Sequence, residues 1–109
     1  AADHIRSLSS APVSKVPTFD IERSKFLKMK GDQAHQAGKS NKAIALFWQA
    51  LKLNPKDPEL YRLLGTAYDQ HGNQAAARSY YEEYVRICPK CPRALSVRKN
   101  LEKFEALAP

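Results

Sequence analysis

The chain has 109 residues, of which 43% are hydrophobic and 27% charged, and its formal net charge is +7. This length suits one small domain, and two cysteines give no support for the disulfide framework of a small secreted scaffold. No apolar run reaches the roughly 18 residues of a membrane-spanning helix, so no such helix is expected.

Residues 1–19 contain several serines and prolines and show no helical or strand period. They also lack the apolar core of about 7–15 residues that a signal peptide needs. We expect a flexible linker here. Two readings stay open: a linker that leads from an upstream module of a larger protein, or the loose tail of a short free-standing protein.

A repeat of 34 residues (89 minus 55) governs the middle of the chain. Pro55-Lys56-Asp57-Pro58 recurs as Pro89-Lys90-Cys91-Pro92. The same shift maps Gly31 onto Gly65, Gly38 onto Gly72, Gln36 onto Gln70, Ala43 onto Ala77 and Phe47 onto Tyr81. Self-similarity at this period predicts a repeated supersecondary unit.

Each unit has the apolar spacing of two helices, which we expect at about 22–37 and 40–53, then at 58–71 and 74–87. A glycine within the first helix of each unit indicates close helix packing, because glycine costs about 1 kcal/mol there. Gly38 and Gly72 are placed to end these first helices in a left-handed turn.

Residues 92–107 form one further candidate helix, with Ala94, Val97, Leu101 and Phe104 at helical spacing. The sequence therefore predicts an all-α domain of five helices, built from antiparallel helix-turn-helix repeats. Repeats of this kind usually offer open surfaces to other proteins.

The residues that characterise the repeated unit are Leu64, Gly65 and Tyr68, the small Ala43 and Ala77, the aromatic Phe47 and Tyr81, and the prolines Pro55 and Pro89. With these residues, the unit resembles the motif of the tetratricopeptide repeat family. The resemblance covers about residues 24–91. It implies a helical solenoid at 20–109, with repeat 1 at about 24–57, repeat 2 at 58–91 and a capping helix at 92–107. Repeat 1 departs from the motif at Lys30 and Ala34.

The positive charge is concentrated in the first repeat, because residues 23–56 hold eight Lys or Arg and one acidic residue. The resemblance implies that the first helix of each repeat lines a concave groove. The candidate partner-binding residues are Lys25, Lys28, Asp32, His35, Arg62, Thr66, Asp69, Arg93 and Asn100. We expect Lys28, Arg62 and Arg93 to face an acidic segment of a partner protein, the alternative being a solvated basic surface.

Nucleic acid is a weaker candidate partner, although clustered Lys and Arg favour phosphate binding. Stacking on bases needs exposed aromatic side chains, and most aromatic residues here fall at inward repeat positions. Trp48 is the exception, and it is expected to pack on a neighbouring helix or to remain partly exposed.

Cys88 and Cys91 form a C-x-x-C pair at the turn positions that Asn54 and Asp57 occupy one unit earlier. That equivalence favours a structural or incidental role over a redox pair or a zinc site. A zinc site needs four ligands, and no histidine has a suitable spacing. We expect no cofactor and no metal.

No catalytic constellation is present, and the chain is predicted not to be an enzyme. We expect a protein-interaction module that docks an acidic or amphipathic segment in its groove, as part of a larger bacterial signalling or assembly protein in the cytoplasm. No small-molecule substrate is expected. Homo-oligomerisation through the first or the last helix is the alternative.

Overall fold

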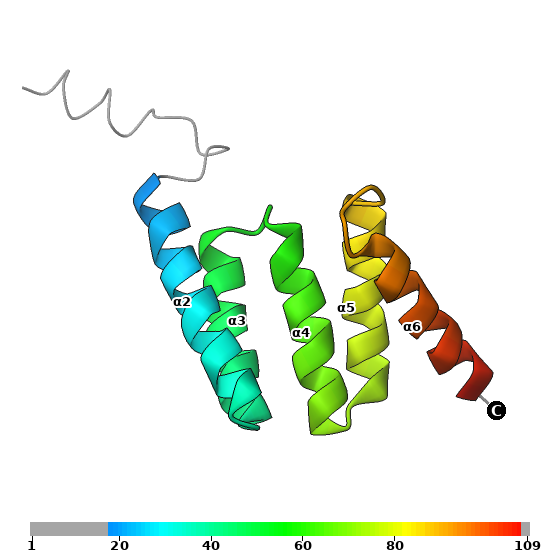
Figure 1. Cartoon of the computed structure of the whole chain (residues 1–109). Helices are drawn as coiled ribbons and strands as arrows, with labels where there is room; N and C mark the ends of the chain where they lie inside the picture. Colours follow the sequence, from blue (N-terminus) through cyan, green and yellow to red (C-terminus); the bar gives the residue numbers. More distant parts are fainter. Residues whose placement is uncertain (1–17, 108–109) are drawn as a thin grey trace, which may run out of the picture.

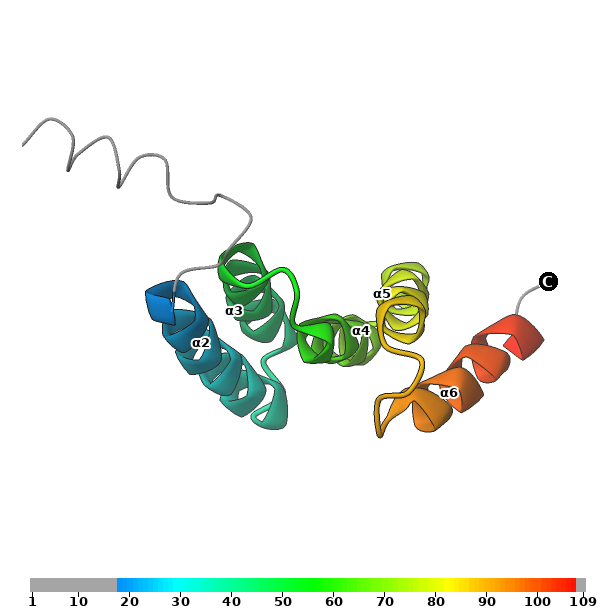
Figure 2. The same ribbon diagram turned by 90° about the horizontal axis from the view of Figure 1, so that it is seen from above.

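The computed structural model describes residues 18–107, which form five α-helices and no strand. The helices are α2 (Thr18–Gln36), α3 (Ser40–Leu53), α4 (Pro58–His71), α5 (Gln74–Ile87) and α6 (Ala94–Leu107). They follow one another in a row (Figure 1), and a view from above places α3 and α5 on one side and α2 and α6 on the other (Figure 2). The all-α repeat architecture expected from the sequence is confirmed.

Helix α2 begins at Thr18 and not near residue 22, so the last two residues of the expected linker are helical. Ser24 explains the difference, because it stands where repeat 2 has Pro58. Proline is tolerated in the first turn of a helix and breaks its interior, whereas serine lets the helix continue towards its N-terminus. The rest of the expected linker, residues 1–17, lies outside the described residues.

In repeat 2 the chain just before Pro58 is a helix cap. The side chain of Asp57 accepts a hydrogen bond from the backbone N–H of Glu59 at 3.0 Å. This bond satisfies one of the donors that a helix start leaves without a partner. Helix α4 therefore starts where the sequence predicts, with a proline in its first position.

The two helices of each repeat touch at a glycine. A Cβ atom added to Gly31 would lie 2.6 Å from the ring of Phe47, and one added to Gly65 would lie 2.6 Å from the ring of Tyr81. Carbon atoms in contact normally stay about 3.5–4.0 Å apart. The expected close approach is therefore present in both repeats, with an aromatic ring seated on a bare backbone.

The turn between the helices of each repeat also depends on a glycine. Gly38 has a φ of 79° and Gly72 a φ of 92°, in the left-handed region that side chains with a Cβ rarely adopt. The backbone N–H of Gly72 and that of Asn73 bond to carbonyls in the last turn of α4. Both helices end as the sequence predicts.

The buried side chains form two clusters. The first joins α2, α3 and α4 around Phe47, Leu60 and Leu64, each with no exposed surface. Ser24 is also buried, and its hydroxyl donates to the carbonyl of Ala50 at 2.8 Å, which ties α2 to α3. The second cluster joins α5 to α6.

Helix α6 closes the row at its C-terminal end. It begins at Ala94, two residues later than predicted, and buries Ala94 and Val97 against α5. The ring of Phe104 stacks on that of Tyr81 with centroids 6.0 Å apart. The helix thus covers the apolar side of repeat 2 that would otherwise face water.

Candidate partner-binding groove

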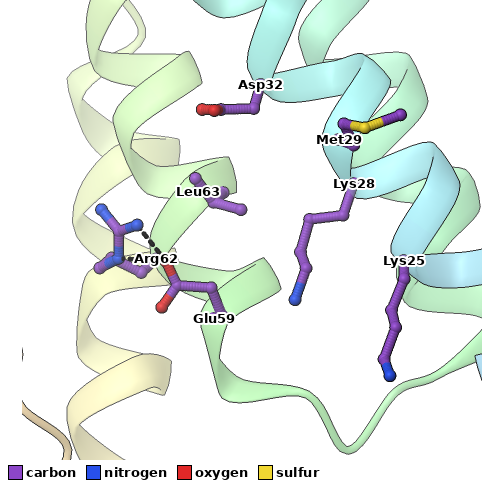
Figure 3. A pocket seen from close by; sticks show the side chains of 7 residues that line it. All are labelled: Lys25, Lys28, Met29, Asp32, Glu59, Arg62 and Leu63. Carbon is purple, nitrogen blue, oxygen red and sulfur yellow. Dashed lines mark hydrogen bonds and ion pairs between the residues drawn. The ribbon is translucent and has the colours of Figure 1, made fainter.

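A cavity of about 340 Å³ opens between α2 and α4 (Figure 3). It is lined by Lys25, Lys28, Met29, Asp32, Glu59, Arg62 and Leu63. Four of the residues predicted to bind a partner, three on α2 and one on α4, therefore come together here. On α2, Lys25, Lys28 and Asp32 are three and four positions apart, and on α4 Arg62 lies three positions after Glu59; that spacing places the charged residues of each helix on one face.

The cations of this cavity are paired within the molecule. Lys28 Nζ lies 2.8 Å from Asp57 Oδ2, and Arg62 Nε donates to Glu59 Oε1 at 2.9 Å. Lys25 Nζ lies 3.5 Å from a carboxylate oxygen of Glu22, one turn earlier on α2. An acidic ligand must therefore compete with carboxylates that already neutralise these side chains.

Two apolar side chains lie among the charges and were not among the predicted site residues. Met29 projects from α2 with 48% of its surface exposed, and Leu63 lies on α4 as part of the core. A thioether chain adapts readily to differently shaped ligands. The signal available in the sequence was the position of Met29, one residue after Lys28 and three before Asp32.

Arg93 and Asn100 do not line this cavity. Arg93 is exposed just before α6 begins, and Asn100 is half-buried within that helix. The structure therefore brings together Lys28 and Arg62, and leaves Arg93 outside the cavity that these two residues share.

His35, Thr66 and Asp69 also lie outside the cavity lining. The hydroxyl of Thr66 is used inside the fold, because it donates to the carbonyl of Arg62 at 3.0 Å and accepts from the hydroxyl of Tyr81 at 3.2 Å. His35 is half-buried, and its Nδ1 has no hydrogen-bond partner among residues 18–107. Asp69 is exposed near the end of α4.

An aromatic cluster marks the junction of the two repeats. Trp48 of α3 meets the ring of Tyr80 of α5 edge-on at 6.0 Å, and its indole N–H donates to the hydroxyl of Tyr68 at 3.3 Å. Tyr80 stacks on Tyr68 at 5.5 Å. Burial, together with the nearby hydroxyls of Tyr68 and Tyr61, raises the pKa of Tyr80 to about 12. Trp48 thus packs on the following repeat while 40% of its surface stays exposed.

Cys88 and Cys91 are joined by a disulfide with their Cα atoms 5.3 Å apart. The bond closes the turn between α5 and α6, a pairing that the sequence did not predict. Within residues 18–107, no cluster of three or more His, Cys, Asp or Glu is placed to hold a metal ion. None of the helices in this range has the length and apolar character needed to cross a membrane.

The chain matches one protein family and is similar to parts of longer proteins. The family described as tetratricopeptide repeat matches residues 28–92. Cellulose synthase operon protein C of Escherichia coli K12 is 37% identical over 62 residues, which is 57% of this chain and 5% of that protein. Protein adenylyltransferase Fic of Drosophila persimilis is 36% identical over 67 residues, 61% of this chain and 13% of that protein. The chain thus spans a small part of either relative.

Proposed function

Because the chain belongs to the tetratricopeptide repeat family, a family of non-enzymatic protein-interaction modules, we propose that it docks a segment of a partner protein in the groove between α2 and α4. The observation that carries this proposal is the cavity itself, because the first helices of both repeats contribute charged and apolar side chains to its lining.

The lining favours an amphipathic segment with one apolar anchor. Leu63 on α4 and Met29 on α2 are the two apolar residues of the lining, beside three cations and two carboxylates. Burial of an apolar side chain supplies most of the affinity at such a site, whereas charge complementarity sets specificity and the rate of association. An acidic residue beside the anchor would face Lys25, whose distance to Glu22 is the longest of the three cation pairs.

The proposal is tested with peptides selected from a random library against the full chain. The double variant Lys25→Gln and Met29→Gln removes one cation and the apolar contact, both at exposed positions, so the fold should persist. We expect the affinity of the selected peptides to fall at least about tenfold, the usual effect of losing an apolar anchor.

A matched control carries Leu95→Gln and Lys99→Gln, which make the same chemical changes on the exposed side of α6. It should keep the wild-type affinity within about twofold. Peptides that bind both variants equally well would contradict docking in this groove. Self-association, the alternative, would instead give a mass that rises with protein concentration in light scattering when no peptide is present.

We further propose that the chain acts within a larger assembly protein in the cytoplasm. The small share of each relative that it covers supports the first part of this proposal. The disulfide between Cys88 and Cys91 is an argument against the second part, because such bonds persist mainly in oxidising compartments. Titration of free thiols in protein isolated under acid quench would test the location: two free thiols support a reducing compartment, and none would contradict it.

A further inference from the structure

The face of repeat 1 that α4 does not cover carries a second groove, between α2 and α3. Two cavities open along it, of about 340 Å³ and about 380 Å³. The first lies where α2 begins and α3 ends, and Leu27 and Leu53 help to line it. The second lies where α2 ends and α3 begins, and Ala34 and Leu46 help to line it. We call this surface the outer groove.

In repeat 2 the corresponding surface is covered by the preceding helix, α3. Leu60, Leu64 and Ala67 of α4 have no exposed surface, because α3 packs against them. The 34-residue shift places Phe26, Lys30 and Gln33 at these positions in repeat 1. Phe26 is 53% exposed, and Lys30 and Gln33 are exposed as well. The outer groove therefore has the geometry that receives a helix, with a lysine and a glutamine where the core leucine and alanine would be.

The charge of the outer groove is strongly unbalanced. Among the described residues that line the two cavities, Asp20 is the one carboxylate, against five cations: Arg23, Lys30, Lys39, Lys42 and Lys52. Within residues 18–107, these cations form no ion pair. The ammonium of Lys30 lies 5.6 Å from the centre of the Phe26 ring, a cation–π contact that leaves its charge uncompensated.

We propose that the outer groove binds an acidic amphipathic helix of a partner protein, in the position that α3 takes on α4 and α5. The two cavities lie towards opposite ends of α3, which has 14 residues and so spans roughly 21 Å at about 1.5 Å per residue. An apolar stripe on the partner helix contacts Phe26, Leu27 and Leu46, and its flanking carboxylates face the lysines. This is the helix-in-groove mode of recognition.

Three other occupants fit less well. A second copy of this chain brings no acidic surplus, since residues 57–109 carry eight basic and seven acidic side chains. A lipid surface favours a protruding apolar face, whereas this face is hollowed at both ends. Nucleic acid gains little from the apolar lining between the cations.

The test uses the full chain and a labelled peptide of about sixteen residues, with leucine at helical spacing and glutamate elsewhere. A scrambled peptide of the same composition is the negative control. Anisotropy should show binding of the helical peptide, weakening as salt rises. The variant Lys30→Glu with Lys42→Glu should lower the affinity at least about tenfold, because it reverses two charges that face the ligand.

Two further variants localise the effect. Lys90→Glu with Lys99→Glu makes the same change in charge at exposed positions remote from the outer groove, and Lys25→Gln with Met29→Gln alters the groove between α2 and α4. Both should bind the peptide as the wild type does. Peptide binding that only the second of these variants loses would assign the peptide to the first groove and overturn the proposal.

Other outcomes that overturn the proposal are equally direct. Absence of peptide binding, or an equal loss in the Lys90→Glu, Lys99→Glu control, excludes specific docking in the outer groove. Binding of phosphatidylserine vesicles that Lys30→Glu with Lys42→Glu abolishes, without peptide binding, assigns the surface to lipid. A dimer in light scattering that the same variant dissociates assigns it to a second copy. Circular dichroism must show that every variant keeps its helices.

Discussion

The two repeats have the same backbone path, but one face of the first helix is buried in repeat 2 and exposed in repeat 1. Both seat an aromatic ring on a glycine, Phe47 on Gly31 and Tyr81 on Gly65, so the packing within each repeat is alike. They differ on the N-terminal side of each repeat: Leu64 is buried there in repeat 2, and the equivalent Lys30 is exposed in repeat 1. A few positions therefore fix the helical hairpin, and other positions decide whether another helix packs on it.

The largest effect is expected when repeat 2 receives the residue of repeat 1. Leu64→Lys places an ammonium at a site with no exposed surface, and burial of an unpaired charge costs several kcal/mol. We expect the free energy of unfolding to fall by about 3–5 kcal/mol in urea denaturation. Leu95→Lys, at a position 64% exposed on α6, is the control and should change it by less than about 0.5 kcal/mol.

The shared glycine–ring contact gives the next largest effect. Gly65→Ala puts a methyl group 2.6 Å from the ring of Tyr81, and overpacking of this kind costs about 1–3 kcal/mol. Gly31→Ala should lose a similar amount against Phe47, and thermal unfolding of both variants measures it. Stabilisation by either alanine, which helix propensity alone predicts, would show that the contact relaxes without cost.

Asp57 joins the repeats through two interactions at once. Asp57→Ala removes the cap of α4 and the partner of Lys28, and we expect a loss of about 1–2 kcal/mol in the free energy of unfolding. Asp57→Asn keeps a capping oxygen, so it should lose less in the same denaturation experiment. Arg23→Ala, the equivalent change in repeat 1, removes no cap and should stay within about 0.5 kcal/mol.

Alkaline pH tests the aromatic junction, where repeat 2 has Tyr80 and repeat 1 has Leu46. The pKa of Tyr80 is raised from 10.0 to about 12, so the folded state holds this proton more tightly than the unfolded chain does. The resulting stability is complete below pH 10 and is lost as pH rises towards 12. Thermal unfolding of the wild type and of Tyr80→Leu should show the larger decline in the wild type over this range.

The smallest effect comes from giving repeat 1 the residue of repeat 2. Lys30→Leu adds an apolar side chain to a face that water already reaches, and removes one cation–π contact. The free energy of unfolding should change by less than about 0.5 kcal/mol, measured in urea beside Leu64→Lys. A gain above about 1 kcal/mol would mean that this face is packed against something in solution.

The helices could be predicted because their signals are local. The 34-residue period, the glycines and the prolines each act within one turn of the backbone they shape, and four helices start and end within two residues of the prediction. The predicted start of α2 was wrong because repeat 1 has Ser24, and no proline, at the position that begins α4 in repeat 2. The absence of a proline is a weaker indication of a helix boundary than its presence.

The ion pairing of the site could not be predicted, because it joins residues that are far apart in the sequence. Lys28 and Asp57 are separated by 29 residues, and they meet only when α3 carries the chain back along α2. The sequence indicated a basic groove, whereas the structure pairs its cations with carboxylates. The disulfide was missed for a different reason, since the spacing of Cys88 and Cys91 is compatible with a free, bonded or metal-bound pair.

The indole of Trp48 makes the junction between the repeats directly observable. It is the one tryptophan of the chain, and it contacts Tyr80 and Tyr68 across that junction. Intrinsic fluorescence excited at the indole therefore reports on one interface and not on the average of the fold. Separation of the repeats would end energy transfer from the neighbouring tyrosines and shift the emission to longer wavelength. A repeat that melts alone and a chain that melts as one unit would then differ in a single spectrum.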